Sequence, residues 1–538
     1  MRIGLFLSRD NGVISHTVDV ASLAREFSHL AATRVYDTFF SALSQRDLAD
    51  TVRRENLTGV VLAGNSPRYY RRVPNGTQIL QRIVDQGVNP NHLAFANLKE
   101  QIALPHASNP KAATRKAHAA IRAALAKLEV AHVVETVSVA PRRAVLIVGS
   151  SEGALLAAQA LLAKDYRVTL IEASDALRVS DDVQEAMLPT RSAVESDERA
   201  QVLYDTTVRD VAGWCGDYSV TLNTANGARS VQVGGIVLAL AGDVELIRGL
   251  RPKLQLDVDA DGQLAREPGD GILGRTKDLG VWFVPRRAKR EPLSEIAARA
   301  SAVVLSLTTV LDSRELAHPV LVSEIDEKVC GGCGTCVKTC AFSASGIDLK
   351  TRLSTLDTRR CKGCGNCVVA CPTGARDLIS YPEAHAIRTI AIYSESAPEP
   401  GAPKVLALLC AGCGYPAADA AGELAAQIED LKYSPNVLPL SVECGGNVDT
   451  QYVLQAFRYG FDGVAVTVCR DGHCHHVVGN TDMDRRLGLF REVLRSRRID
   501  PERLRVIHVS PQEGKLFSEE IQGFCRELAA TGRGAAVA

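Results

Sequence analysis

The feature that most constrains this chain is a run of four cysteines with fixed spacing that occurs twice. In both runs the cysteines are separated by two, two and three residues: Cys330, Cys333, Cys336 and Cys340, then Cys361, Cys364, Cys367 and Cys371. This spacing is typical of proteins with two 4Fe–4S clusters, in which the fourth thiolate of each run binds the other cluster. The sequence therefore predicts one cluster on Cys330, Cys333, Cys336 and Cys371, and a second on Cys361, Cys364, Cys367 and Cys340.

Structural zinc is the alternative ligand for these eight thiols, and the spacing argues against it. Zinc sites usually use two separated pairs of ligands, whereas each run here is an unbroken series of four cysteines. Pro372 follows the last cysteine of the second run, as is usual in this motif, but Ala341 takes that place in the first run. This change alters a turn and removes no ligand. We therefore expect two iron–sulfur cubes that pass single electrons.

The size, charge and cysteine usage of the chain limit the class of protein. A chain of 538 residues is expected to form about three or four domains. The 62 basic and 62 acidic residues give no net charge, which argues against a nucleic-acid-binding protein. All but one of the 15 cysteines lie after residue 329, which favours metal or redox chemistry over disulfides. Without a signal-peptide core or an apolar run of spanning length, we expect a cytoplasmic protein with no transmembrane segment, and leave peripheral membrane association open.

Alternating strand-like and helix-like segments predict a multidomain α/β fold. Apolar runs such as 2–7, 144–148 and 405–409 are typical of buried strands, and residues 18–30 and 450–459 have helical periodicity. The predicted parts are an N-terminal parallel α/β domain (1–140), a degenerate Rossmann-type FAD/NAD domain (141–322), a ferredoxin domain for two 4Fe–4S clusters (323–390), a linker (391–403) and a C-terminal α/β domain (404–538).

Five further cysteines are predicted to meet in the C-terminal domain: Cys410, Cys413, Cys444, Cys469 and Cys474. They follow predicted strands, and the carboxyl ends of parallel strands gather at one edge of a sheet. Four thiolates suit a 2Fe–2S cluster or a zinc ion. The neighbouring His473, His475 and His476 leave mixed ligation open, although exposed loop histidines are the commoner case. Spacing alone leaves both metals open.

A strand, a glycine turn, a helix and a second strand follow residue 143, as in dinucleotide-binding domains. Gly149 occupies the first glycine position of that fingerprint, but Ser151 and Ala154 occupy the second and third, and serine there would crowd the phosphates. Glu172 ends the second strand, where a ribose-binding carboxylate would lie. The candidate flavin-binding residues are Gly149, Ser151, Gly153 and Glu172, and a domain that only packs against its neighbours is the alternative.

The C-terminal cysteine segment resembles the delta subunit of methyl-viologen-reducing hydrogenase, a small domain with a 2Fe–2S cluster. The resemblance spans about residues 405–524 and rests on the segments 409–422, 444–449, 456–464, 469–480 and 502–517. It implies a 2Fe–2S cluster bound by four of the five cysteines, and which four is left open.

Residues 1–390 resemble the A subunit of heterodisulfide reductase. The matching segments are 2–7, 66–68, 96–101, 144–172, 235–239, 297–302 and the ferredoxin repeat. The order of this region and the delta-like domain is similar to that in the B subunit of quinone-interacting membrane-bound oxidoreductase. The resemblance implies an oxidoreductase component whose partners are heterodisulfide-reductase-like subunits and a dehydrogenase or hydrogenase.

Two departures from the heterodisulfide reductase family change the expected cofactors. The family has cysteines for an extra cluster after its first strand, and this chain has residues 8–12, Ser-Arg-Asp-Asn-Gly, so that cluster is expected to be absent. Near its flavin the family has small residues, whereas this chain has Trp282 and Phe283, whose bulk would obstruct a flavin. The basic run 286–290 that follows is typical of a solvated loop, with an anion or partner contact as the alternative. FAD therefore stays an open cofactor.

These features predict the electron-transfer subunit of a heterodisulfide-reductase-like complex. Electrons would pass between a partner dehydrogenase or hydrogenase and an acceptor subunit through one 2Fe–2S and two 4Fe–4S clusters, about ten iron atoms per chain. No side chain is expected to act as a catalytic acid or base. The alternative is a flavin-dependent oxidoreductase with its own substrate site within residues 142–320. Cys215 and Cys525 stand apart from the other cysteines and are expected to be core thiols.

Overall fold

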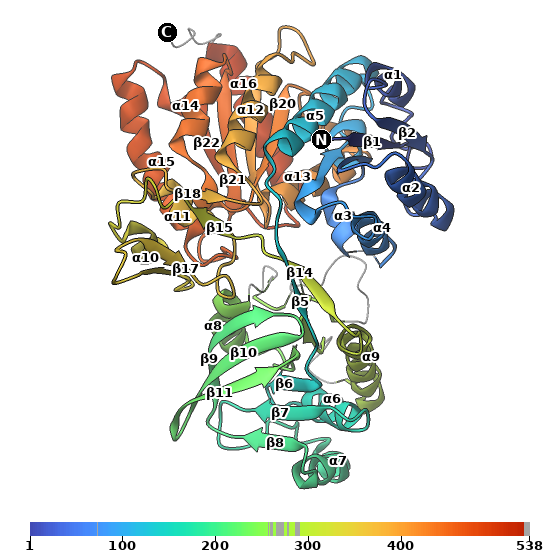
Figure 1. Ribbon diagram of the computed structural model, residues 1–538, viewed down its shortest axis with the longest axis vertical. Helices are drawn as coiled ribbons and strands as arrows, with labels where there is room; N and C mark the ends of the chain where they lie inside the picture. The colour runs from blue at the N-terminus through green and yellow to red at the C-terminus, as the bar shows by residue number, and fades with distance from the viewer. Residues whose placement is uncertain are drawn as a thin grey trace. The chain divides into compact units, whose positions relative to one another are not determined.

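The computed structural model describes residues 1–72, 74–254, 256, 258, 262–264, 274–276, 279–285 and 291–531, so the basic run 286–290 lies outside the described residues. The chain divides into two compact units (Figure 1). Unit 1 comprises Met1–Val134, Leu321–Leu356 and Cys361–Ala538, and unit 2 comprises Glu135–Val320 and Asp357–Arg360. The N-terminal region, the cysteine repeat and the C-terminal region therefore belong to one compact unit.

The N-terminal part of unit 1 is a four-stranded parallel sheet of order β2-β1-β3-β4. Its strands are β1 (Ile3–Ser8), β2 (Ala32–Tyr36), β3 (Gly59–Gly64) and β4 (Leu93–Asn97). Strand β3 is buried along its whole length, as expected for a parallel sheet covered on both faces. Helices α1 (Val20–Glu26) and α5 (Pro110–Val130) share one hydrophobic cluster with the sheet, and α2 (Ala42–Arg54), α3 (Pro67–Arg72) and α4 (Pro74–Val84) share the other.

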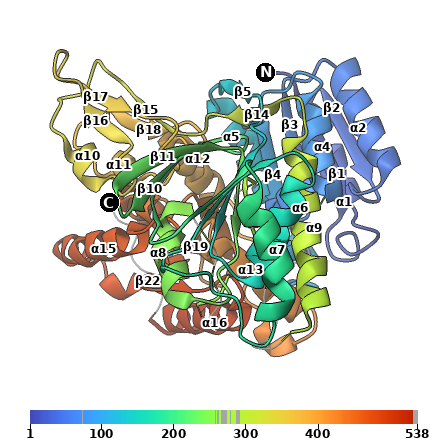
Figure 2. The ribbon, with the colours of Figure 1, turned by 90° about the horizontal axis from the view of Figure 1, so that it is seen from below.

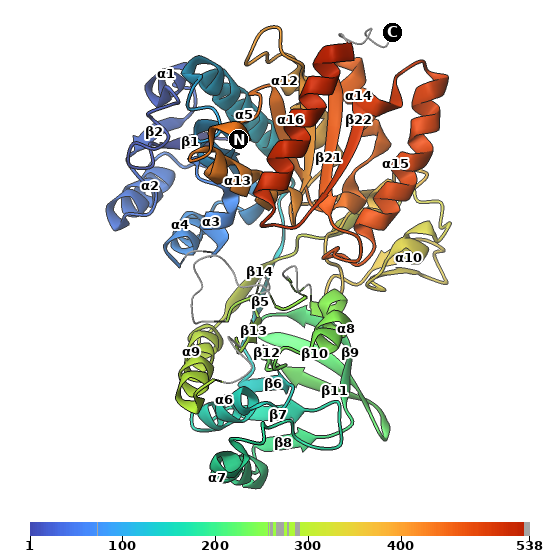
Figure 3. The ribbon, with the colours of Figure 1, turned by 180° about the vertical axis from the view of Figure 1, so that it is seen from behind.

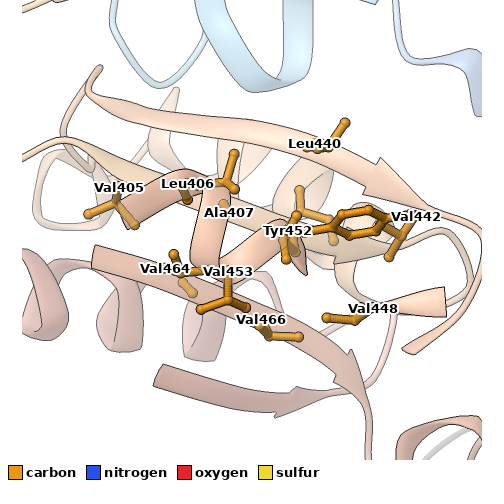
Figure 4. Close-up of a cluster of buried hydrophobic side chains, with 14 of the residues drawn as sticks. Val405, Leu406, Ala407, Leu440, Val442, Val448, Tyr452, Val453, Val464 and Val466 are labelled. Atoms are coloured by element: carbon orange, nitrogen blue, oxygen red, sulfur yellow. The ribbon is translucent and has the colours of Figure 1, made fainter. Parts of the chain in front are cut away.

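The C-terminal part of unit 1 is a second parallel sheet, of order β20-β19-β21-β22, and so has the same topology as the first. Its strands are β19 (Val405–Cys410), β20 (Val437–Val442), β21 (Gly463–Cys469) and β22 (Leu504–Val509). Helices α13 (Gly414–Ala425) and α16 (Gly514–Thr531) pack side by side on one face (Figure 3). Helices α12 (Glu383–Ser394), α14 (Thr450–Arg458) and α15 (Gly479–Ser496) complete this part, and Figure 4 shows the valine-rich core between β19, β21 and α14.

The cysteine repeat, which precedes the second sheet in the chain, consists of short ribbons and single helical turns. Strand β15 (Ser323–Ile325) pairs with β18 (Arg376–Leu378), and β16 (Ser345–Ile347) pairs with β17 (Ser354–Leu356). Each run of cysteines leads into a short helix, α10 (Thr335–Thr339) or α11 (Asn366–Val369). Ribbons of three-residue strands bury little apolar surface, so this region depends on other sources of stability.

Unit 2 is built on a five-stranded parallel sheet of order β13-β12-β6-β7-β8. Its strands are β6 (Ala144–Val148), β7 (Arg167–Ile171), β8 (Ala200–Leu203), β12 (Gly235–Leu238) and β13 (Val281–Phe283). An antiparallel sheet of β9 (Thr207–Trp214), β10 (Asp217–Thr224) and β11 (Gly227–Val233) accompanies it, with the pair β5 (Thr136–Val139) and β14 (Leu316–Pro319). Its helices are α6 (Glu152–Leu162), α7 (Gln184–Ser196), α8 (Val244–Leu254) and α9 (Leu293–Leu311).

Among the described residues, α9 is the one helix long and apolar enough to cross a membrane. It lies beside α6 (Figures 2 and 3), and Val303, Val304 and Leu307 are buried in the core that the two helices share. Arg299 of α9 forms a buried ion pair with Glu291. One face of α9 is therefore packed into the core of unit 2.

Candidate metal centres

The two cysteine runs fold around two separate hollows in unit 1. The first hollow, of about 330 Å³, is lined by Cys330, Cys333, Cys336 and Cys371. The second, of about 340 Å³, is lined by Cys340, Cys361, Cys364 and Cys367. In each hollow three cysteines come from one run and the fourth from the other. These are the two sets that the spacing predicts, and each supplies the four cysteine sulfurs that a 4Fe–4S cluster requires.

Glycines in the left-handed conformation allow each run to curve around its hollow. Gly334 and Gly365, at equivalent places in the two runs, have φ of +74° and +79°. Gly332 has φ of +62°, and a Cβ there would lie 2.1 Å from the carbonyl oxygen of Arg352. Only glycine adopts this conformation without cost. The tight turns point successive cysteine side chains to the same side.

Burial makes several of these thiols hard to ionise on their own. It raises the pKa of Cys364 far above the usual value for a thiol, and also raises the pKa values of Cys361 and Cys367. The pKa of the exposed Cys333 is lowered by hydrogen bonds from Thr335. Because a thiolate is the form that binds iron, the buried set needs a cation to compensate the loss of hydration. A metal cluster in the second hollow would supply that compensation.

The five C-terminal cysteines converge at the carboxyl edge of the second sheet. Cys410 ends β19 and Cys469 ends β21, the two central strands from which the chain continues in opposite directions along the sheet. Parallel α/β sheets bind ligands at such a switch point. Cys413 precedes α13, and Cys444 and Cys474 lie in the loops after β20 and β21. All five are buried, as the convergence predicted from sequence requires.

Two pairs of sulfurs stand out within this group. The Sγ atoms of Cys410 and Cys469 are 3.9 Å apart, and those of Cys444 and Cys474 are 3.8 Å apart. Hydrogen bonds from Cys413, from Cys469 and from the amides of Cys413 and Gly414 hold the pKa of Cys410 well below its usual range.

One of the three loop histidines joins this group of thiols. The Nδ1 atom of His475 lies 3.6 Å from Cys469 Sγ and 3.9 Å from Cys413 Sγ. Ligand atoms of Cys413, Cys469 and His475 all lie within 4.8 Å of one another. His475 and His476 are both buried, against the expectation of exposed loop histidines, and His475 packs on Gly412.

The second cysteine run lies directly against the loop that carries Cys444. A Cβ on Gly365 would lie 2.5 Å from the side chain of Asn447, and a Cβ on Gly446 would lie 2.0 Å from that of Asn366. Asn366 also donates a hydrogen bond of 3.1 Å to Asp482. The hydrogen bond that Cys444 donates to Cys474, burial, and the charges of Cys474 and Cys364 all raise the pKa of Cys444. The second quartet and the C-terminal thiols are therefore neighbours within unit 1.

Helix α13, which begins directly after Cys413, is held on the N-terminal sheet by a buried carboxylate. Asp419 accepts hydrogen bonds from Ser66 Oγ (2.7 Å), Asn97 Nδ2 (2.9 Å) and Gln101 Nε2 (2.8 Å). Glu100 lies beside it in the π-helix η2 (Lys99–Ala103), which packs against α13. Burial, with the charge of Asp419, raises the pKa of Glu100. Sequence reasoning missed this network, because its members lie more than 300 residues apart in the chain.

The residues predicted to bind a flavin are engaged with one another in unit 2. Gly149 keeps the left-handed turn, with φ of +93°, but Ser151 donates a hydrogen bond of 3.0 Å to the carbonyl of Ala239. Gly153 packs closely on Val284, where a Cβ would approach to 2.9 Å. Glu172, the expected ribose ligand, accepts a hydrogen bond of 2.6 Å from Ser150 and lies 3.2 Å from Arg178.

A carboxylate lies at the start of α6, where a dinucleotide-binding domain would hold a phosphate. Glu152 opens α6 and is buried, and its carboxylate accepts a hydrogen bond of 2.7 Å from the Ser180 amide. A helix N-terminus with exposed amides attracts a phosphate, whereas a carboxylate already placed there repels one. Trp282 and Phe283 are buried in the sheet. These residues do not fit a bound dinucleotide.

Comparison with known proteins places the C-terminal region in a family. Residues 405–532 match the family described as methyl-viologen-reducing hydrogenase, delta subunit. The iron-sulfur D subunit of F420-non-reducing hydrogenase from Archaeoglobus profundus is 36% identical over 122 residues, which cover 23% of this chain and 85% of that protein. This chain belongs to the hydrogenase delta-subunit family through its C-terminal region. The predicted resemblance of the delta-subunit region is thereby confirmed, and its five cysteines lie within the matched residues.

The preceding regions match other proteins. Residues 355–377 match a 4Fe-4S binding domain. The A subunit of ferredoxin:CoB-CoM heterodisulfide reductase from Methanosarcina mazei is 32% identical over 249 residues, which cover 46% of this chain and 30% of that protein. A second heterodisulfide reductase relative, from Methanopyrus kandleri, is 42% identical over 175 residues, or 26% of its length. The predicted fusion of a heterodisulfide-reductase-like region to a delta-subunit region is confirmed, and the chain spans under a third of these heterodisulfide reductase relatives.

The relatives are components of oxidoreductases, as predicted, since they are subunits of heterodisulfide reductases and hydrogenases. Among solved structures, an oxidoreductase from Agrobacterium tumefaciens overlaps 31% of this chain and 97% of its own, with a TM-score of 0.22 and 10% identity. A TM-score this low carries no argument. The sequence relatives and the thiol geometry therefore carry the assignment.

Proposed function

We propose that this protein is the electron-transfer subunit of a heterodisulfide-reductase-like complex. Electrons would pass between a 2Fe–2S cluster in the delta-subunit region and two 4Fe–4S clusters in the cysteine repeat. The observation that carries this proposal is the contact of the Gly365 and Asn366 turn with Gly446 and Asn447, because it joins the second quartet to the C-terminal thiols. Single electrons pass efficiently only between centres that lie close together.

The two close pairs of sulfurs favour one choice among the five C-terminal cysteines. A 2Fe–2S cluster binds two thiolates on each iron. Cys410 with Cys469, and Cys444 with Cys474, form two such pairs that share no member. We assign these four as ligands and Cys413, which faces His475, as the fifth thiol. In this assignment Cys444, whose loop contacts the second cysteine run, is one of the four ligands of the 2Fe–2S cluster.

This ligand assignment is tested by changing one cysteine at a time. Serine in place of Cys410, Cys444, Cys469 or Cys474 should abolish or strongly alter the 2Fe–2S paramagnetic resonance signal. Cys413→Ser should keep it. The second candidate, a zinc ion on Cys413, Cys469 and His475, is favoured by their mutual approach. Zinc in place of two iron atoms, with loss of that zinc in Cys413→Ser, would replace our assignment by the second candidate.

A conduit for single electrons is favoured over a flavin-dependent oxidoreductase. Ser150, Ser151 and Glu152 of the glycine turn are hydrogen-bonded to Glu172, Ala239 and Ser180, so the residues that would hold a flavin are taken up by internal contacts. We therefore propose that the Rossmann-type domain binds no FAD, and that unit 2 has a structural role. Two-electron chemistry would then belong to partner subunits.

Anaerobic purification of the full chain with metal counting and flavin extraction tests the whole proposal. We expect about ten iron atoms per chain, the paramagnetic signals of cubes and of a 2Fe–2S cluster, and no stoichiometric flavin. Thermal melting with added FAD should show no upward shift, because a ligand that binds the native state raises its stability. Stoichiometric FAD, or zinc in either hollow, would contradict the corresponding part.

The partners and location follow from the same chemistry. We propose that a dehydrogenase or hydrogenase docks at the delta-subunit region and that a heterodisulfide-reductase-like subunit exchanges electrons with the cubes. Clusters of reduced thiols belong to a reducing compartment, so we propose a cytoplasmic location. Identification of proteins that co-purify under anaerobic conditions tests both statements.

A further inference from the structure

Arg376 is a buried arginine that lies between the two cysteine quartets. It belongs to β18, where it pairs with Ile325 of β15, and only 4% of its surface is exposed. It lines the first hollow together with the first quartet. No prediction from the sequence singled it out.

The guanidinium contacts serines that in turn contact cysteines of both quartets. Its Nη2 donates hydrogen bonds to Ser354 (2.6 Å) and Ser345 (3.3 Å), and its Nη1 donates one to Ser323 (3.3 Å). Ser354 Oγ lies 3.1 Å from Cys336 Sγ in the first quartet, and Ser323 Oγ lies 3.6 Å from Cys367 Sγ in the second. One charge is thus connected to both hollows through one hydroxyl each.

The charge of Arg376 lacks a carboxylate partner within the part of the chain that the structure describes. None of the ion pairs there includes it, and its Nε makes no hydrogen bond. A buried cation is costly unless an anion lies nearby. The candidate anions are the cysteine sulfurs that its serine partners contact, Cys336 Sγ through Ser354 and Cys367 Sγ through Ser323. This arrangement suits a cation that faces negatively charged centres on two sides.

The internal repeat shows that this charge is an addition to one copy. Positions recur 31 residues apart, so that Ser323 corresponds to Ser354, and Ser345 in the first copy corresponds to Arg376 in the second. Three of these four positions carry a serine hydroxyl. The fourth carries the guanidinium of Arg376, which donates a hydrogen bond to each of the three serines. A single arginine that donates hydrogen bonds to serines of both copies can serve both centres.

We propose that Arg376 is a positioning residue that raises the reduction potentials of both 4Fe–4S clusters. Reduction adds one electron to a centre, and the potential depends on net charge and on hydrogen bonds near the sulfurs. A nearby fixed cation stabilises the reduced form more than the oxidised form. Ser354 and Ser323 transmit this effect, one to each quartet. The proposal rests on the proposed function, because it requires cubes in the two hollows.

Redox titration of the full chain, followed by paramagnetic resonance, tests the proposal. Arg376→Met should shift both reduction steps to more negative potentials, with at least a tenfold lower ratio of reduced to oxidised cluster at a fixed potential, which equals 59 mV for one electron. Arg376→Lys, which keeps the charge, should shift them less. The matched control is Arg352→Met, an exposed arginine of the same region, whose charge water screens. It should leave both steps unchanged.

The serines keep the test decisive if Arg376→Met fails to retain iron. Ser354→Ala and Ser323→Ala should each lower one of the two steps and leave the other in place. Unchanged potentials in Arg376→Met with full iron content, or in both serine variants, would overturn the proposal. Absence of cubes in the wild-type chain would instead contradict the proposed function. The two failures are therefore distinguishable in one set of samples.

Discussion

The carboxylate of Asp419 links the N-terminal and C-terminal parts of unit 1. Asp419 accepts three hydrogen bonds from the N-terminal region, and Arg68 lies 3.8 Å away. Asp419→Ala would leave Ser66, Asn97 and Gln101 as buried donors without an acceptor. We expect a loss of about 3 kcal/mol in the free energy of unfolding. Urea denaturation of the full chain measures it.

Glu423→Ala is the matched control for that change, because Glu423 lies on the same helix and is exposed. It accepts one hydrogen bond of 2.9 Å, from Tyr69. We expect a loss below about 1 kcal/mol, as for an ordinary surface contact. Equal losses in the two variants would show that the buried network adds nothing to the stability of unit 1.

The neighbouring Glu100 should make the stability of unit 1 depend on pH. Burial and then the charge of Asp419 raise the pKa of Glu100 in the folded chain, and Lys99 lowers it in part. A carboxyl with a raised folded pKa contributes its full stability below its unfolded pKa, about 4.3, and loses it as pH rises through the folded value. We therefore expect urea midpoints to fall between about pH 5 and pH 8.

Glu100→Gln isolates this effect because glutamine resembles the protonated acid and does not ionise. The variant should be more stable than the wild-type chain at the upper end of that pH range and should show a flatter profile. Parallel profiles for the two proteins would exclude Glu100 as the source of the pH dependence.

At the scale of elements, the strands were predictable and the contacts between regions were not. The apolar run 144–148 coincides with β6, and 405–409 with all but the last residue of β19, because continuous apolar runs suit fully buried parallel strands. The helix expected over residues 18–30 covers only Val20–Glu26. The π-helix η2 had no local signal, since what holds Glu100 and Gln101 in place is α13. Sequence spacing grouped the candidate ligand thiols, but the serines and Arg376 around them could be found only from the fold.

The two equivalent glycines of the cysteine runs allow a matched test of the contact between centres. In Gly365→Ala the new Cβ is strained by the left-handed backbone conformation and also clashes with the side chain of Asn447. In Gly334→Ala only the backbone conformation is strained, because nothing lies within 4 Å of the new Cβ. The conformational cost is about 1 kcal/mol for each.

We expect Gly365→Ala to weaken the magnetic coupling between the second cube and the 2Fe–2S cluster and to slow electron transfer between them, with iron content retained. Gly334→Ala should leave both unchanged. Rapid-mixing reduction followed by freeze-quench paramagnetic resonance measures the rate. Equal rates in the two variants would show that the contact of Gly365 with Asn447 does not set the distance between the centres.

At the scale of the molecule, metal should stabilise one unit and not the other. The predicted cluster ligands all belong to unit 1, and the described part of unit 2 holds Cys215 alone among the cysteines. The ribbons β15–β18 and β16–β17 are too short to be stable by themselves. Removing iron with a chelator should therefore increase hydrogen exchange across Leu321–Leu356 and Cys361–Leu378 and leave unit 2 protected. Uniform loss of protection in both units would contradict this division.

Both parallel sheets of unit 1 have the same strand order, but the residues at their switch points differ. In the second sheet that edge carries Cys410 and Cys469; in the first sheet it carries Ser8 at the end of β1 and Ser66 after β3, and Ser66 binds Asp419. The absence of cysteines after the first strand predicted that the first edge holds no cluster. Its occupation by a helix of the same chain could not be read from local sequence, because the partner lies 353 residues away.

The contact of Asn366 with Asp482 has a kinetic consequence, since both residues belong to one polypeptide. Where two redox proteins must meet before an electron moves, the rate falls when the solution is diluted. A covalent link holds the two groups at a fixed effective concentration that does not depend on how much protein is present. Electron passage between the delta-subunit thiols and the second quartet should therefore proceed at a rate that does not change when the sample is diluted.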